Sequence, residues 1–192
     1  MPPAPAAPAA PAAPAAPAVS PAPTGRVALE RVLADLVADG LAEKELADKL
    51  AINRRSMRSD VHPLVMIADQ KWKDPRNPKK LLHIEALTEW FAGKCGLPYV
   101  HIDPFKIDFS AVTKVMSSAY ATRFKILPIQ VTTRDVVIAT TEPYLRDWEP
   151  QLQQILRLEI KRVIANPLDI NTYIVEFFNL ARSIKGASEK DH

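Results

Sequence analysis

The sequence has few glycines and a single cysteine. Its five glycines form no glycine-rich phosphate-binding loop, so a P-loop nucleotide site within these residues is excluded. The lone cysteine, Cys95, excludes an internal disulfide and a multi-cysteine zinc site. It lies in an apolar series with Leu87, Trp90 and Phe91, which predicts a buried structural thiol.

Long apolar runs are also missing. None approaches the roughly 20 residues that a membrane span needs. The amino terminus lacks the basic start and aliphatic core of a secretory signal. The chain is therefore expected to be cytoplasmic, and to be peripheral to a membrane only through a partner.

The residues that usually carry chemistry form no recognisable constellation. No serine lies in a glycine-flanked elbow. His101 alternates with Tyr99 along a strand-like run and is interpreted as an ordinary strand residue. The histidines show neither helical pairing nor a known metal-ligand pattern with carboxylates; they are His62, His83, His101 and His192. The sequence therefore predicts no catalytic residue and no metal ligand.

Residues 1–25 are expected to be a disordered leader. They consist almost entirely of alanine and proline and carry hardly any charge. Proline removes backbone donors and favours extended conformations, and alanine buries too little apolar area to offset the entropy of ordering. At the other end, residues 183–192 are polar and are expected to form a flexible tail.

Basic residues are concentrated in one segment. Residues 53–80 hold eight basic and three acidic side chains, a net charge of +5, whereas the rest of the chain sums to −2. This distribution predicts a local basic surface rather than a protein that coats nucleic acid. The candidate partner-binding residues of this surface are Lys71, Lys73, Arg76, Lys79 and Lys80.

Residues 26–96 show helical periodicity and predict a helical subdomain. Apolar residues in 29–37 fall on one face of a helix, and Leu46 and Leu50 lie one turn apart in a second helix. A third helix is expected within residues 61–72 and a strong amphipathic helix over 82–94. Residues 74–80 contain two prolines and an asparagine, and are expected to be a loop.

Residues 97–182 mix strand and helix patterns. Strands are expected over 99–102, 126–131, 136–140 and 160–165, and helices over 108–116, 119–125 and 148–158. Pro167 then begins a last helix that buries its apolar stripe, namely Ile170, Ile174, Phe177 and Phe178. The predicted fold class is α/β (α+β): a helical subdomain followed by a small mixed α/β sandwich.

Four segments in order resemble one known family. They read GLPYVHIDPFKID, ILPIQV, DVVIATTEP and IKRVIANPLDI, between Gly96 and Ile170. Their order is similar to the amino-terminal domain of the ATPases of type II secretion and type IV pilus assembly. The sequence departs from that pattern at Glu142, where aspartate is usual, and in the turn at residues 132–135, which lacks its usual glycine.

The resemblance implies a non-catalytic docking and regulatory module. Such domains precede a hexameric ATPase motor in the same chain and dock it on the cytoplasmic part of an inner-membrane platform protein. Because no motor sequence follows residue 192, the chain is expected to be an excised or truncated piece. The basic segment, or exposed apolar residues of the helical half, is the expected contact with the partner.

Some members of that family bind cyclic di-GMP, and a degenerate copy of their motif is present. Arg31 would face the phosphate, but Leu33 stands where the motif has a glycine that lets the backbone approach the ligand. The spacing after Gly40 is one residue short and no glutamine ends the series. The matching residues are Arg31, Leu36, Val37, Gly40, Leu46 and Leu50.

A helix-turn-helix is an alternative interpretation of residues 41–60. One helix would carry Leu46 and Leu50, a turn would occupy residues 51–53, and a basic second helix would follow with Arg54, Arg55 and Arg58. Recognition helices present such arginines to the major groove. The acidic first helix and the α/β half do not require this function.

Overall fold

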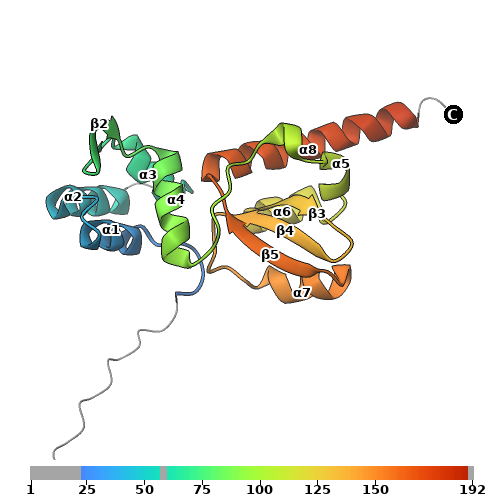
Figure 1. The fold of residues 1–192 in the computed structure, drawn as a ribbon, viewed down its shortest axis with the longest axis horizontal. Coiled ribbons are helices and arrows are strands. Elements are labelled where there is room, and N and C mark those ends of the chain that lie inside the picture. Colours follow the sequence, from blue (N-terminus) through green and yellow to red (C-terminus); the bar gives the residue numbers. More distant parts are fainter. Residues whose placement is uncertain (1–22, 57–59, 190–192) are drawn as a thin grey trace, which may run out of the picture.

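The computed structural model describes residues 23–56 and 60–189, and has an α+β fold with two core clusters. Eight α-helices and two small sheets form the described part of the chain. Figure 1 shows the helical half beside the α/β half, with α4 and the segment that follows it between the two. The fold class predicted from the sequence is confirmed.

The helical half is a four-helix cluster with a small hairpin on its surface. Leu36, Ile67, Leu82 and Leu87 are completely buried at its centre. Its elements are α1 (Leu29–Ala38), α2 (Lys44–Arg55), α3 (Pro63–Asp69), β1 (Lys73–Asp74), β2 (Asn77–Leu81) and α4 (Ile84–Cys95). All four expected helices are therefore present.

Two glycines and a proline set the ends of these helices. Gly40 follows the end of α1 at φ +72°, and Gly96 caps α4 at φ +66°, a left-handed conformation that costs glycine little. Pro63 occupies the first position of α3, where its missing N–H is not needed. These boundaries agree with the pattern that the sequence predicts.

The expected loop at residues 74–80 is wrong, because this segment forms the hairpin β1–β2. Asp74 pairs with Asn77 and Lys73 pairs with Leu81, and the register shifts between the two pairs. That irregularity leaves Pro78 opposite no hydrogen-bonding partner, which is where a strand tolerates proline. Two prolines therefore mark an irregular two-stranded ribbon here.

The turn expected at residues 51–53 is absent. These residues are helical, and α2 continues through Arg54 to Arg55. The helix-turn-helix alternative therefore loses its turn, and two of its arginines lie in the last turn of its first helix. Arg58 lies outside the described residues.

The α/β half is a three-stranded sheet covered by helices. The strands are β3 (Ile126–Val131), β4 (Asp135–Thr140) and β5 (Glu159–Ile164). β3 and β4 form an antiparallel hairpin, and β5 runs parallel to β4. The remaining elements are the 3-10 turn Pro104–Lys106, α5 (Phe109–Val112), α6 (Ser118–Phe124), α7 (Trp148–Leu156) and α8 (Pro167–Ser188).

Helices cover the sheet from different directions. α5 and α6 pack against β3, α8 packs against β3 and β4, and α7, which connects β4 to β5, packs against β5 (Figure 1). The buried stripe predicted for α8 is confirmed, and Ile170, Ile174 and Phe177 are almost fully buried. The two β-branched segments at residues 126–140 form the predicted strands.

Three expectations for the α/β half need correction. Residues 99–102 form no strand, and only Tyr99 makes an isolated bridge, to Ile164. α5 ends at Val112, four residues before the expected end. The flexible tail expected from residue 183 is helical through Ser188, as the continuation of α8.

The two halves meet along β5. Ile164 lies at the end of this strand but is buried in the core of the helical half. Its backbone accepts a hydrogen bond from Val100 N at 2.9 Å and donates one to Pro98 O at 2.8 Å. The division into domains at residues 96–97 stays a prediction, because this shared residue belongs to both.

Candidate functional site

The hairpin β1–β2 displays the predicted partner-binding residues. Lys73, Lys79 and Lys80 are exposed on it, and Lys71 precedes it with an unusual positive φ of 55°. No ion pair with a described residue engages any of these four lysines, which we call the hairpin lysines. The structure therefore brings them together on one exposed ribbon.

Arg76, the fifth predicted residue, has a structural role in the hairpin turn. Its guanidinium donates to both carboxylate oxygens of Asp74, each at 3.0 Å, and its backbone N–H donates to the same carboxylate at 2.9 Å. Hydrogen bonding from Arg76 lowers the pKa of Asp74. Arg76 fixes the turn and is thereby less available to a partner than the lysines.

A groove of about 600 Å³ lies between the hairpin and the α1–α2 connection. Its wall is mostly apolar and includes Leu41, Leu46 and Trp72, whereas Lys73 stands at its rim. We call it the hairpin groove; the other residues that line it are Gly40, Ala42, Glu43, Asp74, Pro75 and Pro78. An apolar surface with lysines beside it suits an amphipathic partner with acidic residues.

Arg31, the predicted nucleotide contact, lies apart from the hairpin groove. It is exposed on α1 and lines a smaller cavity of about 230 Å³ together with Arg26, Asp35, Phe91 and Tyr144. Leu33 is buried in the helical core, so the position that the motif gives to glycine faces away from any ligand. The structure therefore does not bring together the two sites that the sequence suggested.

A buried polar contact joins the two halves. The Glu142 carboxylate accepts a hydrogen bond from Val27 N at 2.7 Å, and lies 3.9 Å from His62 Nε2. His62 Nδ1 accepts from Leu64 N and Nε2 donates to Thr141 O at 2.8 Å, a pattern that requires the neutral imidazole.

Burial shifts both ionisable groups of this contact. It lowers the pKa of His62 to about 4. The positive charge of Arg54 also lowers this pKa, whereas the hydrogen bond to Thr141 raises it. Burial raises the pKa of Glu142, although the Val27 hydrogen bond and the charges of Arg26 and Lys125 oppose the change. Each group is therefore less charged than it would be in water.

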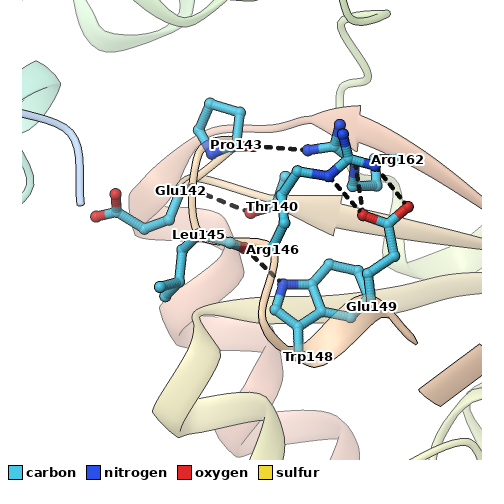
Figure 2. A network of polar contacts seen from close by, with 8 residues as sticks. All are labelled: Thr140, Glu142, Pro143, Leu145, Arg146, Trp148, Glu149 and Arg162. Atoms are coloured by element: carbon cyan, nitrogen blue, oxygen red, sulfur yellow. Dashed lines mark hydrogen bonds and ion pairs between the residues drawn. The ribbon is translucent and has the colours of Figure 1, made fainter. Parts of the chain in front are cut away.

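A network of polar contacts holds the β4–α7 connection in place (Figure 2). Arg146 binds both oxygens of Glu149 at 2.7 and 2.9 Å, and Arg162 lies 3.6 Å from the same carboxylate. Arg162 also donates to Pro143 O at 2.7 Å, and Glu142 N donates to Thr140 Oγ1 at 3.0 Å. These bonds fix the backbone from which Glu142 reaches the helical half.

Sequence reasoning missed the groove and the Glu142 contact. The one signal in the sequence was Glu142 itself, because the related family usually has aspartate at this position. The longer glutamate side chain reaches Val27 across the seam.

The predicted burial of Cys95 is partial, and its sulfur lies 3.5 Å from Tyr144 Oη. Burial raises the pKa of this thiol, which does not favour a reactive thiolate.

The family profile of the MshEN domain matches residues 95–184. These residues are an MshEN domain. The type IV pilus assembly ATPase TfpB of Acinetobacter baylyi is 35% identical over 156 residues, which cover 79% of this chain and 26% of that protein. The chain thus spans about a quarter of the length of this relative, and the resemblance to secretion and pilus ATPases is confirmed.

One solved structure shares the fold of this chain. MshE with cdg superposes with a TM-score of 0.50 at 15% identity, covering 79% of this chain and 99% of that one. The N-terminal domain of XpsE gives a TM-score of 0.37 at 16% identity, over 79% of this chain and 97% of that one.

Among the described residues, no helix has the length and hydropathy to cross a membrane.

Proposed function

We propose that this chain is a non-catalytic docking and regulatory module of a type IV pilus or secretion ATPase. It binds the cytoplasmic part of an inner-membrane platform protein, and thereby holds an ATPase motor at the cytoplasmic face of the membrane. Homology to a pilus assembly ATPase supports the setting. The hairpin groove, lined in part by Lys73 of the same hairpin that carries exposed Lys79 and Lys80, is the observation that supports the docking role.

The physical argument rests on the combination of two features. An apolar groove supplies buried area for affinity, and exposed lysines steer an acidic partner toward it. The lysines face solvent, and none forms an ion pair with a residue in 23–56 or 60–189, so a bound carboxylate would replace water rather than break such a pair. The lysines are not needed to build the helical core, because Lys79 and Lys80 lie on a fully exposed strand.

Charge reversal tests the docking role. The double variant Lys79→Glu/Lys80→Glu should weaken binding of the platform protein's cytoplasmic part by about tenfold or more, measured by calorimetry at low salt. The matched control is Lys114→Glu/Lys185→Glu, which changes the net charge equally on the exposed surface of the α/β half. Equal affinity of the two double variants would contradict the proposed interface.

Cyclic di-GMP binding is a second candidate. MshE has been solved with cdg, and here Arg26 and Arg31 line one cavity with two aromatic rings. Arginine recognises phosphate and aromatic rings can stack on a base. Calorimetry at micromolar protein should show heat that disappears in Arg31→Ala. No heat with the unmodified chain would end this candidate.

The chemistry of the machine would belong to a motor outside these residues. The chain should therefore hydrolyse no ATP by itself, in an assay with Mg²⁺ and the purified protein. ATPase activity that co-elutes with the purified protein would contradict a purely docking and regulatory role.

A further inference from the structure

Three potential metal ligands from three separate elements converge at the seam between the halves. They are Glu85 in the first turn of α4, His101 in the extended segment after α4, and Asp169 in the first turn of α8. One ligand atom of each lies within 4.8 Å of the others. His101 Nδ1 is 3.7 Å from Glu85 Oε1.

Helix capping explains each carboxylate alone but not their convergence. An acidic side chain in the first turn of a helix is stabilised by the helix dipole. Glu85 and Asp169 nevertheless place carboxylate oxygens within 4.8 Å of each other and of a ring nitrogen of His101. Two carboxylates at this separation repel each other, and a divalent cation between them would reverse that cost.

Neighbouring side chains orient Glu85 as an outer shell orients a metal ligand. Tyr99 Oη donates to its Oε2, and Asn166 Nδ2 donates to its Oε1 at 2.8 Å. These two hydrogen bonds hold the carboxylate of Glu85 in one orientation. Each oxygen keeps a lone pair for a metal.

We propose that Glu85, His101 and Asp169 form a binding site for a divalent transition metal, with Zn²⁺ as the best chemical match. One imidazole nitrogen and two carboxylate oxygens are ligands that zinc accepts at about 2.0–2.2 Å, with water in the remaining position. The exposed His101 ring can rotate to close the present separations. A bound ion would tie α4 to α8 and so clamp the two halves together.

The first test is Zn²⁺ titration of the untagged, chelator-treated full chain. Calorimetry should give one site per chain, and the thermal midpoint should rise by about 5 °C at a Zn²⁺ concentration a hundredfold above Kd. Binding should be lost in both His101→Ala and Asp169→Asn. The matched control Glu176→Gln, exposed two turns further along α8, should bind like the unmodified chain.

A second variant separates a positioned site from casual binding by surface carboxylates. Tyr99→Phe removes only the hydroxyl that holds Glu85, and should weaken Zn²⁺ binding by about 10-fold to 100-fold. Substitution of Co²⁺ should give a visible absorption band that His101→Ala abolishes. Absence of binding to the unmodified chain, or undiminished affinity in any of the three site variants, would overturn the proposal.

Discussion

The helical half and the α/β half differ in what their surfaces offer. In the α/β half, helices cover a registered sheet, and residues 95–184 match the MshEN family. The helical half presents the hairpin groove, the hairpin lysines and Arg31. The residues that match the family profile therefore lie mainly in one half, and the hairpin groove and the hairpin lysines lie in the other.

Core truncations test whether this difference in surface is also a difference in stability. Leu36 and Ile138 are both completely buried, one in each core. Leu36→Ala and Ile138→Ala should each lower the free energy of unfolding by about 2–5 kcal/mol. Because Ile164 is buried in the helical core while it belongs to β5, both variants should shift one common transition in urea. Two separate transitions, each moved by one variant, would show independent halves.

Acid should weaken the seam through His62. Its pKa is about 4 in the folded protein, below its usual value of 6.5, so the unfolded chain binds the proton first as the pH falls. The free energy of unfolding therefore rises with pH across this window. As the pH falls from 7 to 4, protonation of His62 alone lowers the free energy of unfolding by about 3 kcal/mol. The raised pKa of Glu142 acts with the opposite sign and offsets part of this loss.

The measurement is the free energy of unfolding against pH for the unmodified chain and His62→Gln. Glutamine does not titrate, and its amide can still donate to Thr141 O. The variant should lose less stability on acidification, whereas the carboxylates elsewhere titrate in both proteins. Parallel pH profiles would mean that the pKa of His62 is the same in the folded and unfolded states.

Local periodicity was sufficient for most of the architecture. The spacing of Ile170, Ile174 and Phe177 determines a helix with one buried face, and the structure places all three against the sheet. Glycine positions 40 and 96 fixed two helix ends for a steric reason that a sequence displays directly. These features depend on residues that are near one another along the chain.

Convergent sites depended on pairings that no local pattern reveals. His101 was interpreted as a strand residue, yet it is exposed and lies beside Glu85 of α4 and Asp169 of α8. The Glu142 contact joins residues 115 positions apart. The hairpin β1–β2 was missed because its bulge accommodates prolines that would exclude a regular strand.

Two tryptophans of the helical half separate docking from folding. Trp72 lines the hairpin groove, whereas Trp90 lies outside it and donates to Asp39 at 2.8 Å. If the groove binds the platform protein, Trp72→Ala should weaken binding by about 30-fold, the effect of a 2 kcal/mol hot spot. Trp90→Ala should leave affinity nearly unchanged in the same calorimetric assay. Equal losses would indicate a general effect on the fold.

The smallest expected effect compares similar surface ion pairs in the two halves. Arg76 and Arg146 each bind one carboxylate through two nitrogen–oxygen contacts, and both side chains are more than half exposed. In the α/β half, Arg162 stays beside Glu149 after Arg146→Ala, so the free energy of unfolding should fall by only about 0.3 kcal/mol.

In the helical half, Arg76→Ala leaves the mostly buried Asp74 with no guanidinium, and with backbone N–H groups of the turn as its remaining donors. The loss should therefore be larger, about 1 kcal/mol. Urea unfolding at low salt and at high salt would test this order, because screening should shrink the exposed Coulomb contribution in both variants. A larger loss for Arg146→Ala would mean that Arg162 does not replace Arg146 as the partner of the Glu149 carboxylate. The network in Figure 2 would then depend on the exposed Arg146.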